Sequence, residues 1–329
     1  MRKTRTLVGT SVVLLSVVST ALAEAPCRTV DIDVLGAYGG YVYDLNNWGQ
    51  VVGSLTAAPP GEASQDQPFV WEHGRTRLLE SPTAVSEARA INAFGRVVGT
   101  MYDAEGKVWP VTWTRGRIAR LASDYQAIAV DVNNRGQVVG YNSQSRGVFW
   151  QSADSVPLDL GTLGGGMAQP EAINDHGTVV GVSALPDNAL HAFVWEDGVM
   201  TDVGLPAHPD PTIEIIRTEL VGINDNGLAV GYAYRSDGTI YPLLWTHEGG
   251  ARVSSAPIVA AAVNNWGTVA ELTSEGNLRL GGYGRPFRNR GRFEGLDEFV
   301  AVDLNDRYQM AFTARRDGAW VPLFCQLTL

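Results

Sequence analysis

The chain has 329 residues, of which 25 are basic and 35 acidic, so its net charge is −10 at neutral pH. This balance argues against a sequence-independent hold on nucleic acid and against a polybasic membrane contact, since both need clustered Lys and Arg. Glycine at 37 positions and charged residues at only 18% indicate many strands joined by tight turns. A chain of this length needs neither a metal nor a disulfide to hold a core.

The first 23 residues have the organisation of an export signal peptide. Arg2, Lys3 and Arg5 precede an apolar stretch over 7–18, and Ala21-Leu22-Ala23 supplies the small-x-small pattern of a cleavage site. The apolar stretch is shorter than the ~20 residues that a membrane span needs. We therefore expect cleavage near Ala23, a secreted or periplasmic product without membrane insertion, and one folded domain over 24–329.

A short pattern, aliphatic-Asn-x-x-Gly-x-Val-Val-Gly, recurs along the rest of the chain and is worn in its last two copies. The repeated asparagines are Asn46, Asn92, Asn133, Asn174, Asn224, Asn264 and Asn305, so the spacings are 46, 41, 41, 50, 40 and 41 residues. A period of about 40 to 45 residues is the length of a propeller blade. We predict an all-β fold, a seven-bladed β-propeller with four antiparallel strands in each blade.

The fourth copy shows the four strands most clearly, at 170–173, 178–182, 191–195 and 199–203. The turn at 174–177 joins the first two, because Asn174 can bind the backbone two residues on and Gly177 can take a positive φ. Small residues such as Ala172 place the first strand nearest the axis, where the blades converge. Trp195 in the third strand, and its equivalents in other copies, are expected in the core between neighbouring sheets.

The two ends of the chain predict how the ring closes. The seventh copy stops after its third strand, and the segment 30–36 parallels the fourth-strand segment 158–164. The N-terminal strand would therefore complete the last blade. Cys27 and Cys325 then lie on either side of the interrupted hairpin, and in an oxidising compartment we expect a disulfide between them. The alternative is a free thiol at each end.

The motifs of the fourth copy resemble the repeat of the HAF family of extracellular bacterial repeat proteins. The matching segments are Asp159-Leu160-Gly161-Thr162-Leu163-Gly164-Gly165, Ala172-Ile173-Asn174, Val179-Val180-Gly181 and His191-Ala192-Phe193-Val194-Trp195. Only this copy keeps His-Ala-Phe, and copies six and seven are eroded. The resemblance implies export and a repeated β architecture, and it brings no established catalytic residues.

Four aromatic residues in the repeated turns are candidates for ligand binding: Trp48, Phe94, Trp266 and Tyr308. They belong to copies one, two, six and seven, which are neighbours once the ring closes, and we call them the aromatic arc. Exposed rings can stack on sugars or accept an apolar segment of a partner. The alternative is that they fold onto adjacent loops and only shield them.

Two sets of charged residues are further candidates. Asp44, Asp131 and Asp303 lie two residues before the repeated Asn, and Asp44 and Asp303 belong to adjoining blades. A pair of carboxylates is the minimum for inverting glycoside hydrolysis, although Asp more often binds nearby turn amides. In the sixth copy four arginines, Arg285, Arg288, Arg290 and Arg292, could seat an anion or an acidic glycan, or could be a solvated strand.

The long connections at 55–68 and 205–220 could also form a binding site. The alternative is that they are surface loops whose sequence has diverged without a binding function. The five histidines are scattered without metal-ligand spacing, and we found no cofactor signature. We therefore expect an exported, monomeric, non-enzymatic module that binds a glycan or another envelope or extracellular protein. The alternatives are a glycan-active hydrolase or lyase that uses the axial carboxylates, and a purely structural surface protein.

Overall fold

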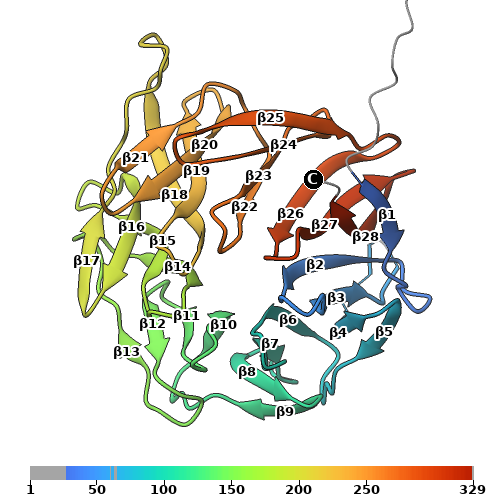
Figure 1. Ribbon diagram of the computed structural model, residues 1–329. Coiled ribbons are helices and arrows are strands. Elements are labelled where there is room, and N and C mark those ends of the chain that lie inside the picture. The colour runs from blue at the N-terminus through green and yellow to red at the C-terminus, as the bar shows by residue number, and fades with distance from the viewer. Residues whose placement is uncertain (1–26, 60, 63–64, 328–329) are drawn as a thin grey trace, which may run out of the picture.

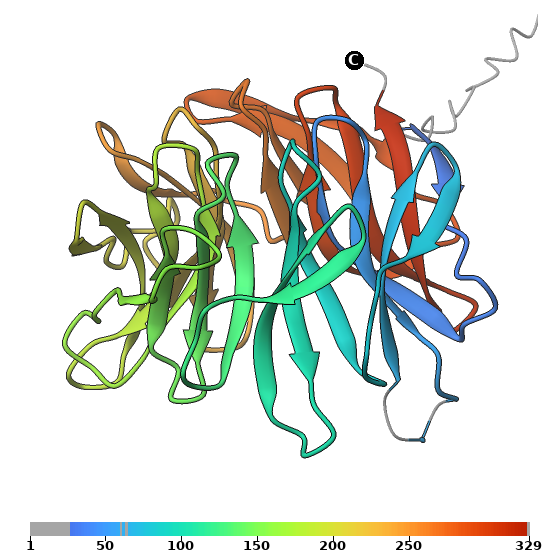
Figure 2. The same cartoon turned by 90° about the horizontal axis from the view of Figure 1, so that it is seen from below.

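The computed structural model describes residues 27–59, 61–62 and 65–327, so the predicted signal peptide and its cleavage site lie outside the described residues. The strands form seven four-stranded antiparallel sheets arranged as a ring around a central axis (Figure 1). Seen edge-on, the ring is a thick disc (Figure 2). The chain is a seven-bladed β-propeller, as the repeat predicts. Among the described residues, no helix has the length and hydropathy that crossing a membrane requires.

Each blade except the last consists of four strands that follow one another along the chain, from the axis to the rim. Blades 1 to 3 are β2 (Gly39–Leu45), β3 (Val51–Thr56), β4 (Asp66–Glu72), β5 (Arg75–Leu78); β6 (Ser86–Ile91), β7 (Val97–Tyr102), β8 (Val108–Thr114), β9 (Arg117–Arg120); and β10 (Ala127–Val132), β11 (Val138–Asn142), β12 (Gly147–Trp150), β13 (Leu158–Asp159). Blades 4 to 6 are β14 (Ala168–Ile173), β15 (Val179–Ala184), β16 (Leu190–Glu196), β17 (Val199–Asp202); β18 (Ile215–Ile223), β19 (Ala229–Arg235), β20 (Ile240–Thr246), β21 (Gly250–Val253); and β22 (Ala260–Val263), β23 (Val269–Leu272), β24 (Asn277–Gly282), β25 (Arg285–Arg292).

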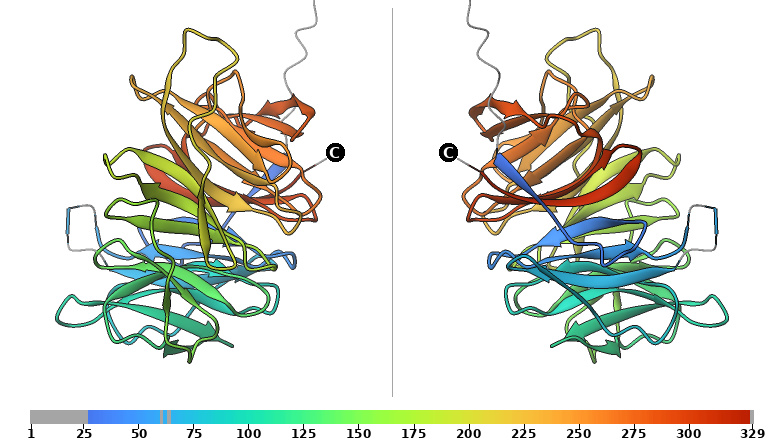
Figure 3. Two further views of the ribbon diagram at one scale, coloured as in Figure 1. Left: turned by 90° about the vertical axis from the view of Figure 1, so that its left-hand side faces the viewer. Right: turned by 90° about the vertical axis from the view of Figure 1, so that its right-hand side faces the viewer.

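The seventh blade joins the two ends of the chain. It contains β26 (Asp297–Leu304), β27 (Gln309–Arg316) and β28 (Ala319–Leu327), and its outer strand is the N-terminal β1 (Cys27–Asp31). β1 lies beside β28 in Figure 1, on the side of the ring that faces the viewer in the right-hand view of Figure 3, and pairs with it antiparallel. Cys27 and Cys325 form a disulfide with their Cα atoms 5.9 Å apart. The completion of the last blade by the N-terminal strand and the predicted disulfide are therefore both confirmed.

A β-bulge in the inner strand explains the last glycine of the repeat. In blades 1 to 5 the pairing of the first two strands skips the residue three positions before the repeated Asn, which in blade 1 is Tyr43. The bulge brings the backbone so close that a Cβ on Gly53 would lie 1.9 Å from the carbonyl oxygen of Tyr41. In blade 6 Glu271 replaces this glycine, and the bulge is absent. In blades 1 to 5 the glycine thus makes room for the bulge at this position, whereas in blade 7, where Phe312 replaces it, the bulge lies one residue earlier, between Val300 and Val302.

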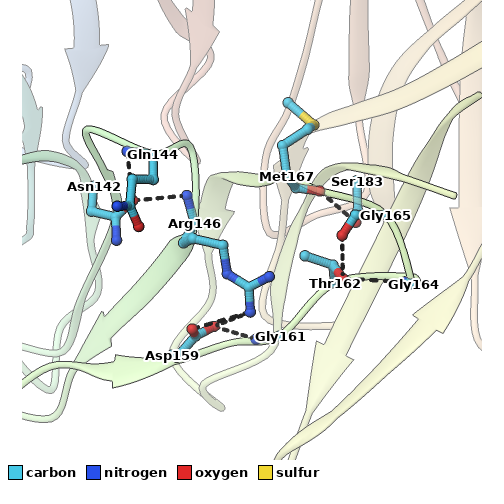
Figure 4. A network of polar contacts seen from close by, with 10 residues as sticks. All are labelled: Asn142, Gln144, Arg146, Asp159, Gly161, Thr162, Gly164, Gly165, Met167 and Ser183. Atoms are coloured by element: carbon cyan, nitrogen blue, oxygen red, sulfur yellow. Dashed lines mark hydrogen bonds and ion pairs between the residues drawn. The ribbon is translucent and has the colours of Figure 1, made fainter. Parts of the chain in front are cut away.

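Residues 159–165, the first of the segments compared with the HAF repeat, belong to the connection between blades 3 and 4 (Figure 4). The Asp159 carboxylate accepts hydrogen bonds from the backbone N–H of Gly161 at 2.8 Å and from the Arg146 guanidinium at 3.1 Å. A Cβ on Gly165 would lie 2.4 Å from the carbonyl oxygen of Leu185. These residues shape a tight connection between blades, which accounts for their pattern without a ligand.

Apolar clusters fill the spaces between neighbouring blades. Trp113 and Trp150 are fully buried in the third strands of their blades, and Trp71 and Trp195 are nearly so. This confirms their predicted place in the core.

The turns between strands one and two, and between three and four, lie on one face of the disc, the upper face in Figure 2. We call it the short-turn face. The connection predicted over 205–220 is shorter than expected, because β18 begins at Ile215. Within it His208 is only 7% exposed, and its ring packs 4.5 Å from that of Tyr241. This connection is therefore part of the packing of blade 5.

Removing the disulfide tests the closure of the ring. The variant Cys27→Ser/Cys325→Ser should lose about 5 kcal/mol of unfolding free energy, because the bond closes a loop between residues 298 apart in sequence. Denaturant unfolding followed by tryptophan fluorescence measures the loss. An unchanged midpoint, or two thiols open to alkylation in the non-reduced wild type, would contradict the assignment.

Candidate functional site

The repeated asparagines form a closed cycle of hydrogen bonds around the axis. The side-chain Nδ2 of each donates to the backbone carbonyl of the equivalent Asn in the next blade, at distances from 2.8 to 3.2 Å. Asn305 closes the cycle by donating to the carbonyl of Asn46 at 2.9 Å. All seven are at most 6% exposed. We call this set the asparagine cycle.

Each side chain in the cycle also organises its own turn. In blade 4 the Oδ1 of Asn174 accepts from the backbone N–H groups of His176 at 3.0 Å and Thr178 at 2.9 Å. Asn can do both because its short side chain carries an acceptor oxygen and a donor nitrogen. The sequence indicated the turn; the bond to the next blade depends on the ring and was not predicted.

A second layer of polar groups surrounds the mouth of the axis on the short-turn face. The residue after the cycle Asn is Asn or Asp in every blade except blade 2, where it is Ala93. The backbone N–H of Asn134 donates to Asp175 at 2.7 Å, and that of Asp175 donates to Asp225 at 2.8 Å. Together with the asparagine cycle, these residues line an open cavity of about 190 Å³.

The three aspartates predicted as axial carboxylates bridge neighbouring inner strands. Asp44 accepts from the backbone N–H of Ile91 at 2.6 Å, and Asp131 from that of Ile173 at 2.8 Å. Asp303 accepts from the N–H of Leu45 at 2.8 Å. The other oxygen of each carboxylate accepts from the residue that follows it in sequence. This geometry supports the interpretation that these carboxylates accept hydrogen bonds from nearby backbone amides.

Asp44 and Asp303 lie side by side, since the N–H of Leu45 donates to both. Burial raises the pKa of Asp44 well above its usual range, and the negative charges of Asp303 and Asp131 raise it further. Burial also raises the pKa of Asp303, and it raises that of Asp131 to about 6. Burial at the axis therefore disfavours the charged form of these carboxyl groups.

A second cavity, of about 270 Å³, lies further along the axis next to the aspartates and was not predicted. The bulge turns the skipped residue toward the axis together with its neighbour, so Tyr43, Arg89 and Glu171 line it. Arg89 is paired with Glu87 at 2.6 Å. Burial, and then the charge of Glu219, raise the pKa of Glu171 to about 7. The signal that could have pointed to this cavity was a charged residue three positions before the repeated Asn, at Arg89 and Glu171.

The aromatic arc is largely exposed. Phe94 is 80% exposed, Trp266 65% and Trp48 57%. The indole N–H of Trp48 donates to the carbonyl of Ala93, and that of Trp266 to the carbonyl of Asp306, both at 2.9 Å. The two indoles are thus anchored by one edge on the next blade while more than half of each remains open to solvent.

Tyr308 differs from the other members of the aromatic arc. It occupies the place of the turn glycine and has a φ of 57°, a left-handed conformation that is uncommon for a bulky residue. Its ring is half-buried against the cluster between blades 6 and 7, and its hydroxyl lies 3.5 Å from that of Thr268. Tyr308 therefore lies between the exposed rings of the arc and the space between blades 6 and 7.

Three of the four predicted arginines come together. Arg285, Arg288 and Arg290 line a groove of about 450 Å³ with Tyr308 and Thr268, and we call it the arginine groove. Arg292, at the end of the same strand, does not line it. Within the part of the chain that the structure describes, no group of three or more His, Cys, Asp or Glu residues is arranged to hold a metal ion.

Comparison with known proteins shows the fold. No protein-family model and no curated protein sequence matches the chain, so the resemblance to the HAF repeat stays a prediction. The β-propeller domain of the Trilobed protease from Pyrococcus furiosus aligns with 88% of this chain and 95% of its own, with a TM-score of 0.60 and 12% identity.

Two other solved structures are similar to the same degree. Catalytically inactive virginiamycin B lyase from Staphylococcus aureus, solved with quinupristin, gives 91% and 99% coverage, a TM-score of 0.59 and 10% identity. YCF48 bound to D1 peptide gives 94% and 99%, with a TM-score of 0.58 and 10% identity. At these identities the likeness shows the propeller fold alone.

A matched pair of substitutions in blade 5 tests the asparagine cycle. Asn224→Asp removes the buried donor to the Asn264 carbonyl, whereas Asn226→Asp removes an exposed donor to the Asn265 carbonyl. The first should cost about 3 kcal/mol of unfolding free energy and the second less than about 1, because only the first leaves a buried carboxylate facing a carbonyl. Equal losses in denaturant unfolding would show that the cycle does not stabilise the ring.

The raised pKa of Glu171 predicts a pH-dependent stability. The folded protein binds this proton more tightly than the unfolded chain, so the unfolding free energy should fall as the pH rises from about 4.5 to about 7. A shift of this size corresponds to about 3 kcal/mol. Glu171→Gln should reduce the slope of the profile, to which the axial aspartates also contribute, while Glu105→Gln at an exposed turn should leave it unchanged. An unchanged slope in Glu171→Gln would refute the assignment.

Proposed function

We propose that this protein is an exported propeller that binds a glycan through its short-turn face. The observation that carries the proposal is the exposure of the aromatic arc: Phe94, Trp266 and Trp48 are 80%, 65% and 57% exposed around the mouth of the axis. Large exposed rings grouped on one face are typical of a binding surface. The anchored edges of Trp48 and Trp266 reduce the entropy lost when a ligand orders these two rings.

The polar mouth beside these rings supports a glycan as the ligand. The cavity is lined by Asn and Asp side chains, among them Asn47, Asp175 and Asp306. Sugars present apolar faces that stack on aromatic rings and hydroxyl groups that exchange hydrogen bonds with amides and carboxylates. The short-turn face offers both kinds of group side by side.

Export is supported by two observations. The disulfide between Cys27 and Cys325 is typical of an oxidising compartment. The N-terminal sequence has the charged, apolar and small-residue parts of a signal peptide. The resemblance to the HAF repeat agrees with this location, and we propose membership of that family on the same grounds.

The hydrogen bonding of the axial carboxylates favours a binding function over glycan hydrolysis. Each oxygen of Asp44 and Asp303 already accepts a backbone hydrogen bond, and these bonds hold neighbouring blades together. A glycosidase needs one carboxyl group to protonate the leaving oxygen and another to activate water or attack. Groups engaged in this way are poorly placed for either task.

A glycan-array screen with matched variants tests the proposal. Trp48→Ala/Trp266→Ala should weaken binding to the best glycan by at least about tenfold, since each stacked ring contributes about 1 kcal/mol. Tyr38→Ala is the control, because Tyr38 is also 57% exposed but precedes β2, away from the short turns.

Unchanged binding in the double variant would refute the role of the arc. YCF48, which has a similar fold, was solved bound to D1 peptide. Capture of an envelope protein in place of any glycan would therefore overturn the ligand class. No ligand of either kind would favour a purely structural protein, and turnover of a glycan would favour the hydrolase.

A further inference from the structure

The arginine groove opens on the short-turn face between blades 6 and 7. Arg285 begins β25 directly after the turn that joins it to β24, and Thr268 and Tyr308 belong to the first turns of the two blades. The groove of about 450 Å³ is therefore formed by the outer strand of one blade and the turns of two.

Irregular strand pairing gathers the three arginines. In a regular strand Arg285 and Arg288, three residues apart, would point to opposite faces. The pairing of β24 with β25 shifts register twice, between Leu278 and Arg279 and between Leu280 and Gly282. Each shift interrupts the alternation of side chains, and all three arginines line the same groove.

No acidic side chain among the described residues pairs with the three guanidinium groups. Among the described residues, Arg285, Arg288 and Arg290 form no ion pair, hydrogen bond or ring contact, although the chain carries a net charge of −10. By contrast, Arg279 on the neighbouring strand is paired with Glu271 at 2.7 Å. Like charges held together without partners repel one another, and an anionic ligand would relieve this repulsion.

The groove continues the aromatic arc. Tyr308 lines the groove and belongs to the arc, and the ring of Trp266 is anchored on Asp306, two residues before Tyr308. The hydroxyl groups of Tyr308 and Thr268 add hydrogen-bonding groups to its wall. A ligand stacked on Trp266 could therefore extend past Tyr308 to Arg285 at the turn and on to the arginines along β25.

We propose that the arginine groove binds the carboxylate or sulfate groups of a linear acidic polysaccharide, whose sugar rings stack on the aromatic arc. This inference rests on the proposed glycan-binding function and specifies its ligand. The planar guanidinium group donates two parallel hydrogen bonds to such groups. Arg288 and Arg290, about 7 Å apart along the strand, would contact successive acid groups.

The test is titration calorimetry with four probes: an oligogalacturonate, a heparin-derived oligosaccharide, a neutral oligosaccharide of equal length and a single-stranded DNA of equal charge. The oligogalacturonate tests carboxylate and the heparin fragment tests sulfate. Arg288→Gln/Arg290→Gln should weaken binding of the preferred acidic probe by about tenfold or more. Arg292→Gln is the matched control, since it removes an arginine from the same strand outside the groove, and it should change affinity less than twofold.

Equal affinity for neutral and acidic probes, an equal loss in Arg292→Gln, or equal binding of the DNA would overturn the inference. The two proposals fail in different ways. If the groove variant loses acidic binding while Trp48→Ala/Trp266→Ala does not, the arc fails and the groove stands. If the arc variant loses binding and the groove variant does not, the glycan-binding function stands and its acidic ligand fails.

Discussion

Seven asparagine side chains set the distance between the blades, because each spans the gap to the next blade and the last returns to the first. The amides are almost completely buried, so an unmade bond would leave a carbonyl without a partner. Every blade must therefore present its Asn at the same height and angle. The axial aspartates add bonds between some inner strands in the opposite sense, because their carboxylates accept from backbone N–H groups. The axis is thus occupied by groups that hold the ring together.

Most inner strands carry a local irregularity, although blade 6 presents its Asn without one. In blades 1 to 5 a bulge before the cycle Asn brings two consecutive residues to the axis, and a glycine lies opposite it. The ends of the chain meet a different requirement, since the last blade would otherwise present an unpaired strand edge. Pairing of β1 with β28, and the disulfide beside it, complete the ring.

The rigid axis leaves the third residue of each first turn free to vary. It is Trp48, Phe94 and Trp266 in three blades and polar in the rest. The aromatic arc and the arginine groove lie on this same face, and Tyr308 belongs to both. The hydrogen bonds that hold the ring together are therefore concentrated at the axis. The exposed groups that could bind a ligand surround it.

The sequence by itself determined the fold, the number of blades and the closure of the ring, because each repeat encodes one blade through local turn chemistry and the paired cysteines mark the cut. It also placed the aromatic residues in neighbouring blades. Only the tertiary structure showed that Asn174 binds the next blade, that Glu171 faces a cavity, that His208 is buried, and that Arg292 is separated from the other three arginines. These outcomes depend on bulges and on contacts between blades, and neither follows from the period of the repeat.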